Sequence, residues 1–195
     1  PRTLHPLLFM SRPLLLAAAL ASITGTSLAQ GGAPGTATPA VADNPIANGR
    51  AARTTQPPVI DGRPDDAAWR AAPVIDQFLE YEPTTGALPR FRTELRILYD
   101  DRYLYVMGRM FAPAPDSIIS LLSRRDVRTE SEQLKVVIDS YHDRRTAYQF
   151  ILNPAGVKRD FYVYNDNVED PTWDAVWDGH ASIDSLGWVA EFRIP

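Results

Sequence analysis

The sequence of 195 residues contains no cysteine and only three histidines. Without cysteine the chain can form no disulfide bond and offers no thiol nucleophile. His142 and His180 are the histidines beyond the N-terminal region, and neither has a G-x-S-x-G nucleophile motif beside it. Because the parts of a nucleophilic site are missing, we expect a non-catalytic domain.

An excess of basic residues is also absent. The whole sequence has 20 Lys and Arg residues against 24 Asp and Glu residues. From Pro57 onward 16 basic residues stand against 23 acidic ones, which gives this part a net charge of −7. Nucleic-acid binding depends on basic patches. We therefore expect no nucleic-acid partner.

No long apolar run follows residue 29, but a short one lies near the start of the chain. Met10 opens the stretch MSRPLLLAAALASITGTSLAQ, in which Arg12 gives a positive charge, residues 13–23 an apolar core and residues 27–29 a small-x-small cleavage site. This core is shorter than the about 20 residues that span a bilayer. Residues 1–29 are thus predicted to be an upstream extension and a secretory signal peptide. The protein is expected to be exported to the periplasm, the outer membrane or the extracellular space.

Large apolar side chains are scarce in residues 30–56, which are rich in Gly, Ala, Pro and Thr. Such a composition cannot bury enough surface to offset the entropy of ordering, so we expect a disordered linker. The folded domain is predicted to cover residues 57–195, a length that supports its own core. Its sequence ends within a strand pattern, EFRIP, so we expect a C-terminally incomplete domain from the N-terminal part of a longer protein.

Strand patterns dominate this domain. In TELRILY, for example, Leu95, Ile97 and Tyr99 recur with a period of two. Similar runs predict strands over residues 93–99, 103–111, 134–140, 147–153, 158–165, 180–185 and 188–194. Short helices are predicted within residues 65–72 and 115–125. The fold class is therefore predicted as all-β, a jelly-roll-like β-sandwich with one or two short helices.

Two of the four tryptophans lie close together in the acidic stretch DPTWDAVWDG, residues 170–179. Trp173 and Trp177 are the candidate carbohydrate-binding residues, because aromatic faces stack against the C–H surfaces of sugars. Sandwich cores use the same residues for bulk. We expect Trp177, which is nearer the following strand, to pack inward, and Trp173 to be the better exposed platform.

The same stretch offers the hard oxygen ligands that Ca²⁺ requires. The candidates are Asp166, Asn167, Glu169, Asp170, Asp174 and Asp178, with Asp170 and Asp174 as the predicted metal ligands. The spacing D-x-D-x-D-G is absent, and the alternative is a solvated acidic loop. A structural calcium ion is the one cofactor that we expect.

Four segments in order carry a resemblance to a known family. They are VIDGRPDDAAW (59–69), TELRILYDDRYLYV (93–106), VVIDS with YQFILNPAGVKRD (136–160) and GWVAEFRIP (187–195). Together they resemble the family 9 carbohydrate-binding module and its relatives, over nearly all of residues 57–195. The most similar relatives are secreted bacterial proteins in which this domain precedes an outer-membrane β-barrel.

This resemblance implies a β-sandwich, structural calcium and, in some members, a sugar held between two tryptophans with the help of charged side chains. One clamp tryptophan aligns near Thr129, an acidic partner at Lys135 and an arginine at Ile151; the second tryptophan aligns beyond Pro195. The known clamp is therefore not carried over, which weakens the inference of sugar binding more than that of the fold.

The expected function is that of an exported, non-catalytic carbohydrate-binding domain, which binds a polysaccharide or oligosaccharide as the N-terminal part of a longer cell-envelope protein. Two alternatives stay open. One is an interaction or plug-like domain for a downstream β-barrel in the same chain, without sugar binding. The other is an accessory domain of a glycoside hydrolase.

Overall fold

The computed structural model describes residues 49–165 and 167–195, so the predicted signal peptide and most of the predicted linker lie outside it. No helix within these ranges is long and apolar enough to cross a membrane. The regular elements are β1 (Ala52–Arg53), α1 (Ala67–Ala71), β2 (Thr93–Tyr99), β3 (Leu104–Phe111), the 3₁₀ turn η1 (Pro115–Ser117), β4 (Leu134–Ile138), β5 (Ala147–Leu152), β6 (Lys158–Tyr164), β7 (Val168–Asp170), β8 (Asp178–Asp184) and β9 (Gly187–Ile194).

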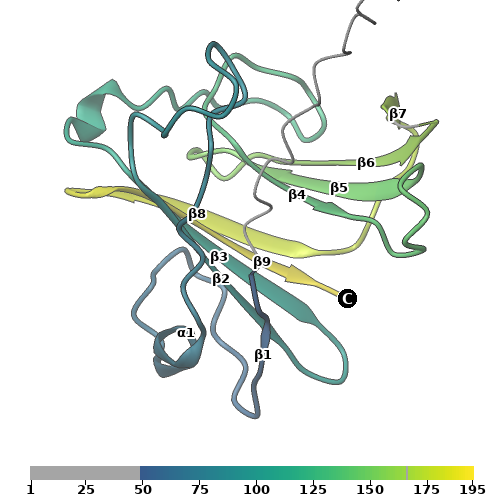
Figure 1. Ribbon diagram of the computed structural model, residues 1–195, viewed down its shortest axis with the longest axis horizontal. Coiled ribbons are helices and arrows are strands. Elements are labelled where there is room, and N and C mark those ends of the chain that lie inside the picture. Colours follow the sequence, from purple (N-terminus) through teal and green to yellow (C-terminus); the bar gives the residue numbers. More distant parts are fainter. Residues whose placement is uncertain (1–48, 166) are drawn as a thin grey trace, which may run out of the picture. The chain divides into compact units, whose positions relative to one another are not determined.

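The strands form two sheets that lie in two layers (Figure 1). The first has five strands in the order β1-β2-β3-β9-β8, and its pairs are antiparallel except for the parallel pair of β1 and β2. The second is antiparallel, with four strands in the order β4-β5-β6-β7. The predicted all-β sandwich is confirmed.

Three local predictions need correction. β1 precedes Pro57, and Ala52 pairs with Leu98 of β2, so ordered structure begins inside the predicted linker. β7 was not predicted. The helix expected over residues 115–125 is reduced to η1, because the carbonyl of Ile119 accepts the backbone N–H of Glu132 at 2.9 Å. This pairing across the chain replaces the hydrogen bonds that a helix needs.

The main core lies between the two sheets. Trp188 and Phe192 of β9 and Phe150 of β5 are buried there, because alternate residues of each strand point into the space between the layers. Leu134, Val136 and Ile138 pack against this core from β4. β9 lies between β3 and β8, and its first six residues, 187–192, are all buried.

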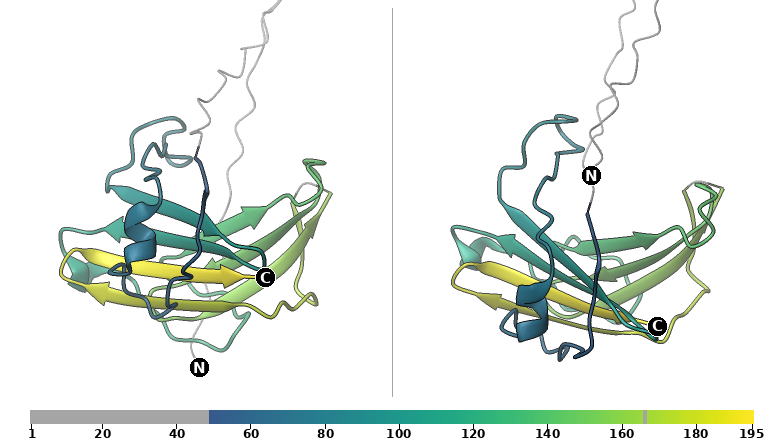
Figure 2. Two further views of the ribbon diagram at one scale, coloured as in Figure 1. Left: turned by 90° about the horizontal axis from the view of Figure 1, so that it is seen from below. Right: turned by 60° about the horizontal axis from the view of Figure 1, so that its bottom comes forward.

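A second core lies on the other face of the five-stranded sheet, beneath α1 (Figure 2). Trp69 of α1 packs there with Leu98, Tyr105, Met107 and Val189. Both faces of the five-stranded sheet are thus covered, which explains why the pattern of β9 departs from simple alternation. The four-stranded sheet uses one face for the main core and keeps its other face for the side chains described below.

Candidate functional site

Trp177 is a core residue. Only 4% of its surface is exposed. Its ring stacks on Phe192 with 5.5 Å between ring centroids and 6° between planes, and it meets Phe150 edge-on. Neither ring face is open to a sugar, so the assignment of Trp177 as a carbohydrate-binding residue is corrected. The expectation that this residue packs inward holds.

Trp173 has a different environment, because the segment between β7 and β8 is not helical and does not put the two rings on one face. Trp173 is half-buried against Tyr148 and Phe150, at centroid distances of 4.9 and 6.0 Å. It lines a groove of about 360 Å³. The other lining residues are mainly apolar: Ile138, Ser140, Tyr148, Phe150, Ala175, Val176, Ile194 and Pro195. A carbohydrate-binding role for Trp173 stays a prediction.

The acidic residues of this segment are engaged by protein groups. Asp174 lies 2.5 Å from a guanidinium nitrogen of Arg125, and Asp170 accepts both the backbone and the side-chain hydrogen bond of Thr172. Within the ranges that the structure describes, no three His, Cys, Asp or Glu side chains form a group that could hold a metal ion. Asp166 lies outside these ranges. Asp170 and Asp174 as calcium ligands, and calcium binding itself, stay predictions.

Arg125 links the segment between β7 and β8, which carries the two tryptophans, to the four-stranded sheet. Besides Asp174, its guanidinium contacts the carboxylate of Asp160 on β6 at 2.9 Å and the carbonyl of Ala175 at 2.9 Å. The side chain of Asp160 is fully buried, and it also accepts the N–H of Ala175 at 2.6 Å. The acidic stretch is therefore held by an ion network that the sequence pattern did not suggest.

Two of the positions aligned with the sugar clamp lie side by side on the four-stranded sheet. Lys135 of β4 and Ile151 of β5 are direct cross-strand partners. Because their sequence neighbours point into the main core, both residues lie on the opposite side of the sheet. We call this side the outer face, and it carries Lys135, Val137, Gln149, Ile151, Arg159, Phe161, Val163 and Glu169.

The family's arginine aligns with Ile151 on β5. Arg159 on β6 is the cross-strand partner of Ile151, so this chain has an arginine on the neighbouring strand. Its surface is 6% exposed, and its guanidinium carbon lies 5.2 Å from the ring centroid of Phe161. Its Nη1 has one long contact, 3.4 Å to Gln133, and its Nε has no hydrogen-bond partner. Burial lowers the pKa of Arg159, the direction expected for a cation that has lost its hydration.

Gln149 is the second polar residue of this kind. It lies on the outer face beside Phe161, and its Oε1 is buried with no hydrogen-bond partner. Buried polar atoms in folded proteins almost always have a partner. The unpartnered Oε1 of Gln149 accepts a hydrogen bond and the unpartnered Nε of Arg159 donates one. A ligand with hydroxyl groups can satisfy both.

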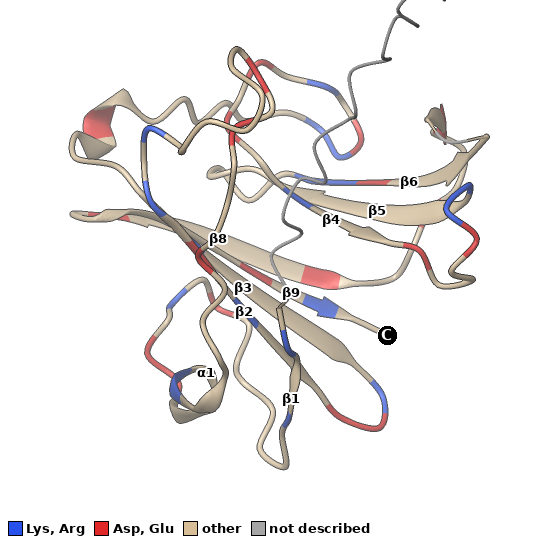
Figure 3. Cartoon of the chain, in the orientation of Figure 1, with Lys and Arg blue, Asp and Glu red and all other residues tan. Residues whose placement is uncertain are grey.

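Charged side chains cross the outer face above these groups. Glu169 of β7 lies 3.8 Å from Nζ of Lys135 and 3.6 Å from a guanidinium nitrogen of Arg128, in the segment before β4. Figure 3 shows basic residues on β4 and β6, and basic and acidic residues alternating in the segment that leads into β4. We call Arg128, Lys135 and Glu169 the charged bridge. It spans the sheet from β4 to β7.

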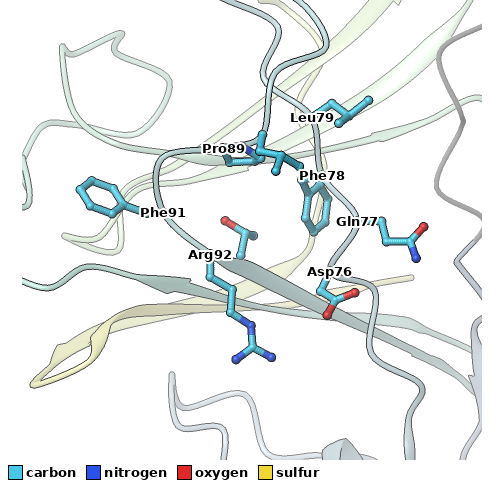
Figure 4. Close-up of a pocket in the computed structure, with 9 residues that line it drawn as sticks. Asp76, Gln77, Phe78, Leu79, Pro89, Phe91 and Arg92 are labelled. Carbon is cyan, nitrogen blue, oxygen red and sulfur yellow. The ribbon is translucent and has the colours of Figure 1, made fainter.

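Another cavity lies elsewhere, in the chain between α1 and β2. It has a volume of about 550 Å³ and is lined by residues 76–79, 88, 89 and 91–93 (Figure 4). Figure 4 shows Phe78 inside this group, with Asp76 and Arg92 as its charged members. Arg92 is already paired with Glu94. The cavity is formed by neighbouring segments of one loop and offers few free polar groups, so we do not assign a ligand to it.

Sequence reasoning missed Gln149, Arg159 and the role of Glu169. A signal was present, because strict alternation along β5 places Gln149 opposite to the apolar residues Tyr148 and Phe150. That signal could not reveal burial, which depends on the charged bridge and on the segment before β4. The cross-strand register that brings Arg159 beside Ile151 is also a property of the fold alone.

The two facing sheets define the class of this protein, an all-β sandwich. Its fold resembles two solved structures of a family 9 carbohydrate-binding module from Caldicellulosiruptor kristjanssonii. The structure in complex with cellotriose is 17% identical, with a TM-score of 0.52, and the match covers 74% of this chain and 66% of that one. The structure in complex with glucose is 16% identical, with the same TM-score and coverage of 73% and 66%.

The chain thus spans just under two thirds of the length of these two structures. No known family profile and no curated protein matches the sequence. The likeness establishes a family 9-like fold. Both neighbours are named as carbohydrate-binding modules.

Proposed function

We propose that this chain is a carbohydrate-binding domain whose ligand site is the outer face of the four-stranded sheet. The observation that carries the proposal is that Gln149 Oε1 and Arg159 Nε are buried without a hydrogen-bond partner on one face of the sheet; the third such atom among the described side chains, Nε1 of Trp177, lies in the main core. Leaving either atom unpaired destabilises the folded protein. A sugar hydroxyl can both donate and accept a hydrogen bond, so it can pair with either atom.

Two further observations support this location. Lys135 and Ile151, which align with polar clamp positions of the resembled family, lie on the same face as Gln149 and Arg159. The structural neighbours are named as carbohydrate-binding modules, in complex with cellotriose and with glucose. The ligand class is thus argued from the unpaired atoms and agrees with what those neighbours bind.

The cellular setting belongs to the same proposal. The pattern of residues 10–29 supports export, and the domain would serve as the N-terminal part of a longer protein of the cell envelope. Mass spectrometry of the N-terminus of the protein recovered from the envelope fraction tests export. An N-terminus upstream of residue 29 would argue against signal cleavage.

Binding is tested by isothermal titration of the full chain with a panel of neutral and acidic oligosaccharides. Gln149→Met keeps the side-chain length and Arg159→Met keeps an unbranched apolar stem, and both remove the hydrogen-bonding atoms. Each should weaken binding by about tenfold or more, the usual effect of losing a hydrogen bond to a bound sugar or leaving its partner unpaired. Trp173→Ala, in the separate groove, is the matched control and should leave binding unchanged.

Two results would contradict the proposal. If Trp173→Ala abolished binding and the two outer-face variants did not, the groove would be the site. If the folded wild-type chain bound no oligosaccharide, carbohydrate binding itself would be refuted. A cooperative thermal transition, measured on each protein, shows that it is folded.

One observation favours the rival function, an interaction domain without sugar binding. The groove beside Trp173 is mainly apolar, and Val176 on its rim is 92% exposed. Exposed apolar patches of this kind mark contacts with other proteins or domains. A chain that binds no oligosaccharide, but whose groove is protected from labelling in the longer protein, would support this function.

A further inference from the structure

The outer face carries more positive charge than its own carboxylates neutralise. Its cations are Lys135 and Arg159, and Arg128 lies beside it in the segment before β4. Glu169 is the one acidic residue within 4 Å of any of these three in the described part of the chain. Asp126 also lies close enough to influence Arg159, but its carboxylate is paired with Arg125 and accepts the N–H of Asp160.

Arg159 is the cation without a partner. No carboxylate of the described residues lies within 4 Å of its guanidinium; its contacts are the face of Phe161 and the distant amide oxygen of Gln133. An unpaired charge with 6% exposure is costly, and a guanidinium in this state has free donors for a planar anion. A carboxylate matches this geometry through two parallel N–H···O bonds.

The charged bridge shows which anion this face accepts. Glu169 places a carboxylate between Lys135 and Arg128, but its distances of 3.8 and 3.6 Å exceed those of hydrogen bonds. The side chain of Arg128 is 73% exposed, and those of Lys135 and Glu169 are 36% and 28% exposed. Ion pairs so long and so near solvent contribute little, so the bridge can open at small cost.

We propose, building on the proposed carbohydrate-binding function, that the preferred glycan is acidic. A uronic-acid carboxylate binds Arg159 and Lys135, and the sugar hydroxyls reach Gln149. In the free protein Glu169 stands in for that carboxylate and closes the face, so the ligand competes with it. The binding is non-covalent, and Lys135 exchanges the carboxylate of Glu169 for the carboxylate of the ligand.

Two ligands of one backbone test this inference: trigalacturonic acid and its fully methyl-esterified, uncharged form. Isothermal titration of the full chain should show the acid binding about tenfold tighter or more, as expected for a charge-assisted bidentate contact. Raising the salt concentration should lower the affinity of the chain for the acid and leave its affinity for the ester nearly unchanged.

Glu169→Gln removes the internal competitor and should raise the affinity for the acid about threefold or more. A variant that merely loosened the fold would bind both ligands less well. Asp101→Asn is the matched control, since it removes one negative charge from an exposed pair with Arg53 on the other sheet, and it should change nothing. Arg159→Lys keeps the charge but loses the planar fork, and it should reduce the preference for the acid.

The outcomes separate this inference from the proposed function. Equal affinity for the acid and the ester, or binding of cellotriose in preference to both, would overturn the acidic preference and leave carbohydrate binding intact. Lower affinity of Glu169→Gln for the acid would overturn the role of Glu169 as a stand-in. If no oligosaccharide bound at all, both proposals would fall.

Discussion

Trp69 donates its indole N–H to Oε1 of Glu191 at 2.7 Å, although the two residues are 122 positions apart in the sequence. The other oxygen of Glu191 accepts the backbone N–H groups of Asp61 and Gly62 at 3.0 and 2.7 Å. The first and last of the four family-like segments therefore meet at one buried carboxylate on β9. Their joint occurrence in the sequence has a physical cause, because each supplies half of this contact.

Glu191 makes stability depend on pH. Burial raises its pKa from 4.5 to about 7, against the opposing effect of its three hydrogen bonds. Between these values the folded protein holds a proton that the unfolded chain has released. The contribution of Glu191 to the free energy of unfolding should therefore be fully present below pH 4.5 and fall by about 3 kcal/mol as the pH rises through 7.

Urea unfolding from pH 4 to 8 checks this dependence in the wild type and in Glu191→Gln. The variant cannot titrate at this position, and its profile should be flatter. It should also be less stable, because an amide NH₂ would face one of the three donors. Identical slopes in the two proteins would show that Glu191 does not control the profile.

The two tryptophans of the acidic stretch should differ in their contribution to stability. Trp177→Ala should lower the free energy of unfolding by about 3–5 kcal/mol, because it empties a site between Phe150 and Phe192. Trp173→Ala should cost about 1–2 kcal/mol, since its ring is half-buried at the groove. Chemical denaturation measures both values. Equal losses would contradict the division into a core residue and a surface residue.

Arg125→Ala should destabilise the fold by about 2 kcal/mol, because it leaves the buried carboxylate of Asp160 without its cation. The matched control is Arg53→Ala, which breaks an exposed pair with Asp101 and should have little effect. Thermal unfolding of both variants compares them. If Arg125→Ala unfolded at the same midpoint temperature as the wild type, the ion network would not stabilise the segment that carries Trp173.

Arg159→Met should leave the free energy of unfolding unchanged or raise it by about 1 kcal/mol, because it replaces an unpaired buried cation by an apolar side chain. Arg96→Met is the contrasting control, since Arg96 donates hydrogen bonds to the carbonyls of Ala72 and Trp69 and its loss should destabilise. Unfolding in guanidinium chloride measures the stabilities of the two variants and of the wild type, which should fall in this order: Arg159→Met equal to or above the wild type, and Arg96→Met below it. Strong destabilisation by Arg159→Met would mean that Arg159 is a structural residue.

Gly187→Ala should be strongly destabilising. Gly187 has a φ of +140°, and a Cβ there would lie 2.1 Å from the carbonyl oxygen of Met110. The strain and the clash together should cost more than about 3 kcal/mol. Gly156→Ala is the control, because its φ is +78° but nothing lies within 4 Å, so about 1 kcal/mol of backbone strain remains. Similar midpoints of thermal unfolding would refute this distinction.

The sequence predicted most of the fold because the longer strands carry their own pattern. Leu95 and Ile97 of β2 alternate with polar residues, and the alternation alone places them against the core. β1 and β7, with two and three residues, are too short to show a period. The segment around Ile119 has a helical composition, and its backbone pairing with Glu132 overrides that local preference.

The candidate site was less predictable. The acidic stretch suggested ligands, yet Trp177 is enclosed by the core and Asp174 is paired with Arg125. In the sequence Arg159 is one basic residue of KRDFYVYN, and nothing local shows that it is buried. Its burial and its lack of a partner arise from cross-strand register and from the segment before β4, which are tertiary properties.

The place of β9 in the five-stranded sheet has a consequence for folding. β9 follows the other described strands in the sequence, yet it pairs with β3 on one side and β8 on the other and supplies Glu191 to Trp69. A chain that emerges with its N-terminus first leaves the edge of β3 open and α1 without its anchor until residues 187–194 appear. Because these contacts join distant parts of the chain, the five-stranded sheet should form slowly and only after β9 is available.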